Sequence, residues 1–311
     1  MSDLLKSYRL LVRSIFVFFI FPLFSFAQQD TTVKQNPFNK KRFVAVSTTA
    51  ISVQAISFIG LNQLWYADYP KSKFHFFNDN DEWLVLDKVG HVFNTYSIAH
   101  ASYKVYRWCG VNKKKSVLYG SLMGMSYISC IEILDGYSAH WGFSPGDMIA
   151  NVTGTALMAT QELLWEEQRF TIKYSYRESG LAKYRPELLG KSLLEKGMKD
   201  YNAHTFWLSW NPASFMTRDS RFPKWLNIAV GYGGTGMIGG TSNPLFDDKG
   251  NALPVFKRYS EYYVSLDVDL SRIKCKSKFL RTLIHVANRV KVPFPALMYS
   301  NNKFGVDWIG F

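Results

Sequence analysis

The chain has 311 residues, with 37 Lys and Arg against 24 Asp and Glu, for a formal net charge of +13. This charge suits a protein that lies near anionic lipid or glycan; we expect no nucleic-acid partner, because the N-terminal segment predicts export. The three cysteines form no CxxC pair, which argues against a structural zinc site and against a disulfide framework.

Residues 1–27 have the pattern of a secretory signal peptide. Three basic residues precede the apolar run SIFVFFIFPLFSFA, and Ser25 and Ala27 supply the small side chains that a signal peptidase requires. The alternative is an uncleaved membrane anchor, which Pro22 and the shortness of the run disfavour. We expect cleavage after Ala27, followed by a flexible polar leader over 28–41.

Four apolar helical segments over 42–168 predict a four-helix bundle. The first, 42–66, is long enough to cross a bilayer, but its Thr, Asn and Gln residues suit a buried bundle helix equally, and we favour the latter. The other three helices are expected at about 88–108, 115–135 and 145–166. Asp87 is the expected N-cap of the second helix, and Ser144, followed by Pro145, marks the start of the fourth.

After the helices the pattern changes, and residues 169–311 predict a small antiparallel β region with two further short helices, so that the fold class is α+β. Five strands are expected at 169–176, 205–210, 225–233, 261–270 and 303–311, and the helices at about 186–199 and 277–290. In the fourth strand Val264 and Leu266 share one face and Asp267 lies on the other, as in a half-buried strand whose apolar face packs on a core. Five strands are too few for a transmembrane barrel, which needs at least about eight.

Three of the predicted helices carry polar side chains at helical spacing. These are Asp87, Lys88 and His91 on the second helix, Glu132 and Asp135 on the third, and Asp147, Asn151 and Gly154 on the fourth. If the bundle brings them together, His91, Glu132, Asp135 and Asp147 could bind a divalent cation or carry out acid–base chemistry. Structural explanations stand beside this one, because Asp87 and Asp147 can serve as caps and His91 as a hydrogen-bonded core residue.

Glu132 is the hardest of these residues to explain by structure alone, because a carboxylate within an apolar helix is costly to bury unless it is paired. We predict that His91 and Glu132 are direct partners across two helices, with Lys88, Asp135 and Asp147 nearby. In the interpretation that we favour, the pair sets the register of the bundle. In the alternative, His91 is a catalytic base and the carboxylates Glu132, Asp135 and Asp147 hold a metal.

Three motifs occur in a fixed order along the second, third and fourth helices. They are DKVGH (Asp87 to His91), EILD (Glu132 to Asp135) and GFSPGDMIANVTG (Gly142 to Gly154). In order and spacing they resemble the YfiM-like family of predicted bacterial envelope lipoproteins, domain of unknown function 2279, over about 86–165. The residues that match the family pattern are Asp87, Lys88, His91, Glu132, Asp135, Asp147, Asn151 and Gly154.

The chain departs from that family pattern at two places. No lipobox cysteine follows the signal, and Ile131 stands where the family commonly has a basic residue before its glutamate. The chain also has a weaker similarity to the VanZ-like membrane family, which carries a helix histidine, a later glutamate and an Asp-x-x-x-Asn stripe. Neither resemblance implies a known activity.

From these observations we expect an exported protein of the periplasm or outer envelope, associated with a membrane. Its expected role is structural or binding, with a membrane or an envelope lipid or glycan as partner. One alternative is a metal-assisted hydrolase or transferase that acts on such a lipid or glycan. Another is a chain that spans the bilayer through 42–66 and 116–134. A divalent metal is the only cofactor that the residues suggest.

Overall fold

The computed structural model describes residues 37–62, 70–217, 219–247 and 249–311, so the predicted signal peptide lies outside the described residues. The described part is α+β, as predicted, with seven α-helices and a six-stranded antiparallel sheet. It forms two compact units. The helical unit comprises residues up to Asp79, Asn94–Gln168 and Ser277–Val286, and the sheet unit comprises Asn80–Phe93, Arg169–Lys276 and Ala287–Phe311.

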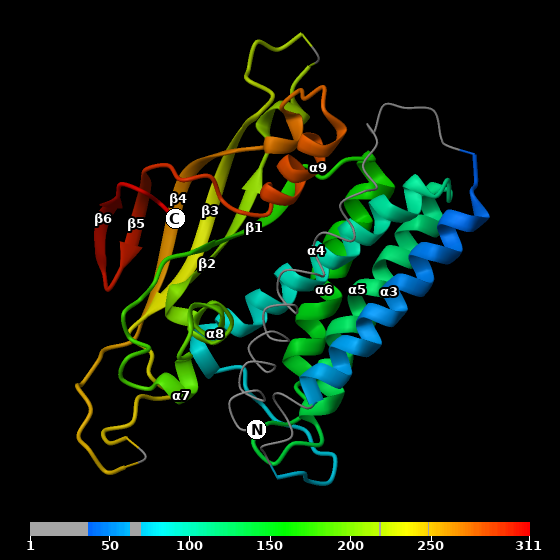
Figure 1. Ribbon diagram of the computed structural model, residues 1–311. Helices are drawn as coiled ribbons and strands as arrows, with labels where there is room; N and C mark the ends of the chain where they lie inside the picture. Colours follow the sequence, from blue (N-terminus) through cyan, green and yellow to red (C-terminus); the bar gives the residue numbers. More distant parts are fainter. Residues whose placement is uncertain (1–36, 63–69, 218, 248) are drawn as a thin grey trace. The chain divides into compact units, whose positions relative to one another are not determined.

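Long helices make up most of the helical unit (Figure 1). They are α3 (Lys40–Leu61), α4 (Leu86–Trp108), α5 (Lys113–Asp135) and α6 (Pro145–Trp165), with the shorter α9 (Lys278–Ala287) later in the chain; the first two turns of α4 belong to the sheet unit. The predicted helices are confirmed to within about two residues at the ends of α4, α5 and α6. Asn112 and Ser144 cap α5 and α6, because their side chains accept hydrogen bonds from backbone N–H groups of the first turn.

Two glycines let α4 and α5 approach each other closely. A Cβ atom added at Gly120 would lie 2.6 Å from the carbonyl oxygen of Ala99, and one at Gly124 would lie 2.8 Å from that of Thr95. The neighbouring atoms are backbone, which cannot move aside as a flexible side chain can. The G-x-x-x-G spacing of this pair is typical of helices that pack backbone to backbone.

All six strands run antiparallel to their neighbours, in chain order (Figure 1). They are β1 (Phe170–Tyr176), β2 (His204–Trp210), β3 (Leu226–Thr235), β4 (Tyr259–Val268), β5 (Ala296–Ser300) and β6 (Lys303–Asp307). The five predicted strands are present, and β5 is the one that we missed. Its signal was the turn to β6, where Asn301 and Asn302 adopt φ of 49° and 58°, the left-handed pair that a two-residue hairpin requires.

The helix predicted over 186–199 is two separate helices, α7 (Pro186–Leu189) and α8 (Leu193–Lys199). Gly190 separates them, with a φ of 101° that only glycine adopts readily. A Cβ atom at this position would lie 2.5 Å from the backbone carbonyl carbon of Glu195. The sequence pattern therefore predicted one continuous helix, and Gly190 was its only sign of the break between α7 and α8.

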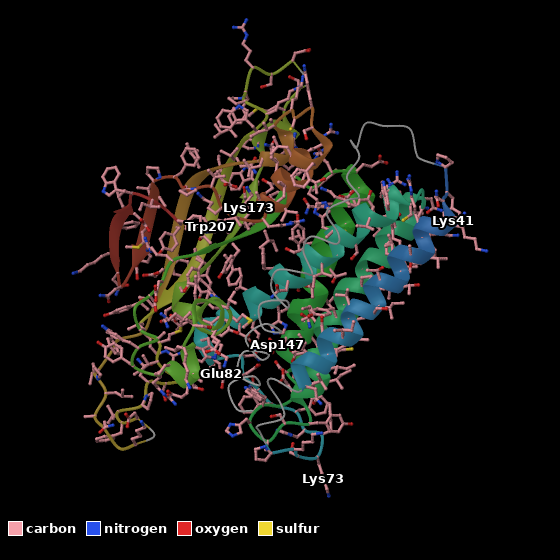
Figure 2. All side chains as sticks on the ribbon, viewed as in Figure 1. Lys41, Lys73, Glu82, Asp147, Lys173 and Trp207 are labelled. Atoms are coloured by element: carbon pink, nitrogen blue, oxygen red, sulfur yellow. The ribbon has the colours of Figure 1, made fainter. Side chains whose placement is uncertain are left out.

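The sheet buries its polar face, which is the reverse of the expected arrangement. We call the face that carries Lys173 and Trp207, on the neighbouring strands β1 and β2, the inner face (Figure 2). On this face Lys173 and Asp267 are fully buried and form an ion pair of 2.6 Å. On the outer face Val264 and Leu266 are about half exposed. The alternation was therefore predicted correctly. The apolar face packs on a core only in part: Phe206 of β2 is buried in a cluster with Leu86, whereas Val264 and Leu266 of β4 are exposed.

The inner face is a network of hydrogen bonds between buried polar groups. Ser209 donates to Asp267 at 2.7 Å, and Asn227 donates to Ser209 at 2.9 Å. The segment after α9 pairs with the free edge of β1, and from it Lys291 reaches over the ring of Trp207 at 4.8 Å. Because buried charges and amides require partners, this network explains how a polar face can form the interior of the unit.

Candidate functional site

The first turns of α4 position Asp87, Lys88 and His91 within the sheet unit. The short η2 (Glu82–Val85) leads into the helix through consecutive residues with positive φ, and Leu86 then packs fully buried against Phe206. The helix begins at Leu86, so the prediction that Asp87 is the N-cap was wrong. The helix therefore starts two residues earlier than predicted, after the unusual backbone that precedes Leu86, and Asp87 contacts the side chains of Tyr201 and Lys88.

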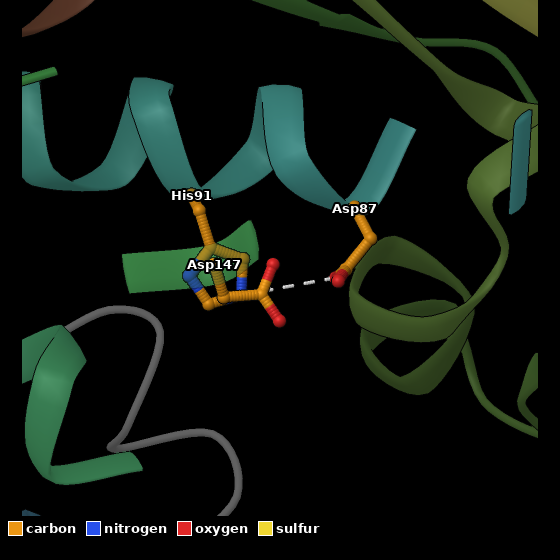
Figure 3. Close-up of side chains that lie close together, drawn as sticks. All are labelled: Asp87, His91 and Asp147. Carbon is orange, nitrogen blue, oxygen red and sulfur yellow. Dashed lines mark ion pairs between the residues drawn. The ribbon is translucent and has the colours of Figure 1, made fainter. Parts of the chain in front are cut away.

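Asp87 is the centre of a small polar cluster. Its Oδ1 accepts a hydrogen bond from the Tyr201 hydroxyl at 2.5 Å, and its Oδ2 accepts one from Lys88 at 3.2 Å. His91 Nε2 lies 3.9 Å from Oδ1, an ion pair without a hydrogen bond, drawn in Figure 3. With side-chain exposures of 23%, 10% and 16%, Asp87, Lys88 and His91 are largely shielded from water. A carboxylate beside an imidazole is an arrangement that general bases and metal-ligating histidines share.

The predicted carboxylates of the third helix lie near the end of α5. The Glu132 side chain is buried, with 2% of the residue exposed, while Asp135 is half-buried. Burial of Glu132 is the costly situation that the sequence predicted, since a buried carboxylate requires charged or hydrogen-bonding partners. Glu132 is therefore buried, and its pairing with His91 stays a prediction.

The stripe of the fourth helix lies on the buried side of α6. Asp147, Asn151 and Gly154 are all buried, as their i, i+4 and i+7 spacing predicted for a common face. Ser144 caps the helix by accepting from the backbone N–H of Asp147 at 3.1 Å, and its own hydroxyl donates to Asp79 at 2.6 Å. Asp147 therefore lies at a helix N-terminus, where the helix dipole favours a negative charge.

The structure groups the predicted residues within each unit. Asp87, Lys88 and His91 contact one another in the sheet unit, while Glu132, Asp135, Asp147 and Asn151 lie on α5 and α6, which pack together in the helical unit. The predicted pairing of His91 with Glu132 joins residues of different units, so it stays a prediction. The predicted metal ligands also come from both units and stay a prediction.

A second buried pair, missed from the sequence, joins α4 and α6 inside the helical unit. His100 Nε2 lies 3.7 Å from Glu162 Oε1, with 8% and 4% of the two side chains exposed, and Gln168 donates to the same oxygen at 2.9 Å. The signal was the stripe on α6, because steps of three or four residues from Asp147 lead to Glu162. The polar interior therefore runs along most of α6 and is not confined to its first turn.

A family model matches part of this chain. Residues 75–162 match the family DUF2279, described as a predicted periplasmic lipoprotein, and these residues include every predicted site residue. No curated protein and no solved structure matched the chain. The description agrees with an exported protein of the envelope, as the sequence predicted. The matched residues 75–162 contain all three motifs, so the resemblance to this family of predicted periplasmic lipoproteins is confirmed over that part of the chain.

Proposed function

We propose that this chain is an exported envelope protein whose helical unit is a bundle of α3 to α6 embedded in a membrane, with a structural or binding role. One observation carries the proposal: the helices expose apolar side chains and bury polar ones. The residues exposed on α3, α5 and α6 include Val44, Ile51, Ile56, Ile59, Leu118, Leu122, Ile133, Ile149, Val152, Leu163 and Leu164. The buried polar residues of α4, α5 and α6 include Thr95, Ser97, His100, Ser116, Glu132, Asp147, Asn151 and Glu162.

This distribution of side chains suits lipid better than water. Burying an aliphatic side chain of this size stabilises a protein by about 1.5–3 kcal/mol, so each such side chain that stays in water adds nothing of this to the stability of the fold. In a bilayer the same side chains contact acyl chains, and the polar groups satisfy one another inside the bundle. By length and composition α3 (Lys40–Gly60) and α5 (Lys113–Asp135) can each cross a membrane.

Two further features of the helical unit support insertion. Helices α3 and α5 run in the same direction, since the Phe43 ring lies 5.8 Å from Tyr119 and the Phe58 ring lies 5.4 Å from Tyr127. Their basic first turns therefore lie at one end of the unit, where they suit anionic headgroups. These residues are Lys40, Lys41, Arg42, Lys113, Lys114 and Lys115.

Carbonate extraction of envelope membranes tests the proposal directly. We expect the full-length protein to stay in the membrane pellet at alkaline pH, because its apolar helices hold it there. Release into the soluble fraction would instead indicate a peripheral protein and would contradict insertion of the bundle.

Cysteine labelling locates the inserted surface. In a background with Cys109, Cys130 and Cys275 replaced by serine, we expect Ile56→Cys to resist a charged maleimide in sonicated membranes. The matched control is Lys73→Cys, on an exposed loop of the same unit (Figure 2), which is expected to react fully. Equal labelling of both positions in intact membrane fragments would place Ile56 in water and refute the proposal.

A metal-assisted hydrolase or transferase that acts on an envelope lipid or glycan is the second candidate function. The Asp87–His91 ion pair favours it, because a carboxylate beside an imidazole is a common arrangement at catalytic and metal sites. In this candidate His91 acts as base, and Glu132, Asp135 and Asp147 hold the cation. Carboxylate and imidazole donors suit a divalent ion, so elemental analysis of the purified protein beside Glu132→Gln tests it. Equal metal content in the two proteins would contradict this candidate.

A further inference from the structure

We propose that the exposed part of the outer face of the sheet, from Leu208 in β2 to Val306 in β6, is a lipid-binding surface that lies against the acyl chains of one leaflet of an anionic bilayer. The argument uses only the sheet unit, so it does not depend on insertion of the helices. Three properties of the face carry it: where the strands place their charges, how apolar residues are ordered in rows, and which charges border the face.

The six strands carry no charged side chain on their outer face. Every Lys, Arg, Asp and Glu within the six strands lies on the inner face; these residues are Lys173, Glu261, Asp267, Lys303 and Asp307. The outer face of the strands holds none of these residue types. A sheet in water normally shows the opposite polarity, with its apolar face packed on a core. Lipid-facing sheets have polar interiors and apolar exteriors, as this one does.

The apolar residues of the outer face form rows that run across the strands. The first is aliphatic and spans five strands through successive register partners: Leu208, Val230, Val264, Leu297 and Val306. All five are exposed, by 38% to 64%. The neighbouring row ends in exposed aromatic residues, Tyr262, Tyr299 and Phe304, which are also register partners. On the other side of the aliphatic row, Trp210 ends β2 and the exposed Trp308 directly follows β6.

Aliphatic residues bordered by Tyr and Trp on both sides are typical of a membrane surface, where aromatic rings prefer the headgroup level. The height of the band decides how deeply the face can insert. From Tyr262 to Leu266, the register row of Trp210, is four residues, or about 13 Å at roughly 3.3 Å per residue. A transmembrane sheet needs an apolar band of about 25 Å and at least about eight strands. The face is therefore suited to one leaflet and cannot span the bilayer.

The charges bordering the face favour an anionic bilayer. Arg221, Lys224, Lys274 and Lys276 are exposed in the loops next to β3 and β4. Basic groups near an anionic lipid surface are attracted to it. This positive border explains why a lipid surface, and not an apolar protein partner, is the assigned occupant.

Depth-dependent quenching in vesicles tests the assignment. Leu297→Cys, in the full chain with the native cysteines replaced by serine, is labelled with an environment-sensitive dye and reconstituted into vesicles with anionic lipid. We expect nitroxide-labelled acyl chains to quench this dye several-fold more than they quench the same dye at Val255→Cys. Val255 is a matched control, because it is an exposed apolar residue of the same unit outside the strands.

Three outcomes would overturn the proposal. Equal quenching at the two positions would place the outer face in water. Protection of the Leu297→Cys dye from both lipid and aqueous quenchers would show that a protein, or a second copy of the chain, covers the face. Unchanged quenching when neutral lipid replaces the anionic lipid would remove the role of the basic border. The dye at Leu297→Cys reports on the sheet unit and maleimide labelling at Ile56→Cys reports on the helical unit, so failure of one proposal is distinguishable from failure of the other.

Discussion

At the residue scale, the buried carboxylate of Glu132 provides the sharpest test of the predicted site. Under the structural interpretation that we favour, Glu132→Gln leaves a buried cationic partner without its counter-charge. We therefore expect the free energy of unfolding to fall by about 3 kcal/mol. Thermal denaturation in detergent measures the change. Glu166→Gln is the matched control, because its side chain is 71% exposed in a pair with Lys113 and exposed pairs contribute under about 1 kcal/mol.

The same variant separates the two functions. Under the catalytic interpretation Glu132→Gln changes stability little but abolishes metal binding or the envelope phenotype. If stability, metal content and phenotype all stay as in the parent protein, the predicted site is wrong and His91 is an ordinary helix residue.

His204 in β2 gives the sheet unit a dependence on acid. Burial lowers its pKa from 6.5 to about 4, and its Nε2 has no hydrogen-bond partner among the described residues. Because the unfolded chain binds this proton more readily, stability is full above about pH 6.5 and falls as the pH drops toward 4. The difference between the two pKa values corresponds to about 3 kcal/mol in the free energy of unfolding.

Denaturation curves at pH 7.5 and pH 4.5 measure this loss, with His204→Phe as comparison. Phenylalanine keeps the aromatic contacts with Tyr174 and Phe206 and removes the titration. We expect the variant to lose about 3 kcal/mol less than the parent protein between the two pH values. An equal loss in both proteins would show that other groups cause the dependence on acid.

At the element scale, helix positions followed from local signals while the pairing of helices did not. The caps Asn112 and Ser144 made α5 and α6 predictable, since each is a short-range contact between neighbours in sequence. The pairing of His100 with Glu162 was missed because the two residues are far apart in the chain, and only packing brings them together. The strand β5 was missed because five residues between prolines and a turn give a weak periodic signal.

The close contact of α4 with α5 makes Gly124 intolerant of larger residues. We expect Gly124→Leu to destabilise the helical unit by at least about 1–3 kcal/mol, because the added atoms meet the Thr95 backbone and cannot be accommodated by side-chain movement. The melting temperature of the detergent-solubilised protein measures the effect. Ser126→Leu, which adds the same side chain at an exposed position of α5, should leave it nearly unchanged. Similar effects of the two substitutions would argue against the backbone contact.

At the scale of the whole molecule, both units expose apolar side chains and bury polar ones. This shared polarity, more than any single residue, supports a protein that works at a membrane. It also agrees with a family described as predicted periplasmic lipoproteins. Reaching that location requires export, which the first 27 residues predict.

We expect the protein isolated from the cell envelope to begin at Gln28, because signal peptidase cuts after small residues such as Ala27. N-terminal sequencing of the purified protein checks this. An intact Met1 on protein recovered from the cytosol would refute export, and an intact Met1 in membranes would support the uncleaved anchor.

The sequence by itself determined the α+β class, the ends of α4, α5 and α6, and the resemblance of residues 75–162 to a family of predicted periplasmic lipoproteins, because caps, periodicity and motif spacing act over a few residues. Only the tertiary structure decided which face of each element is buried. Period-two alternation in β4 separates Val264 and Leu266 from Ser265 and Asp267, but it assigns neither pair to the interior. That choice depends on the partners of the buried groups. Lys173, far away in the sequence, neutralises Asp267 and makes the polar face the stable interior.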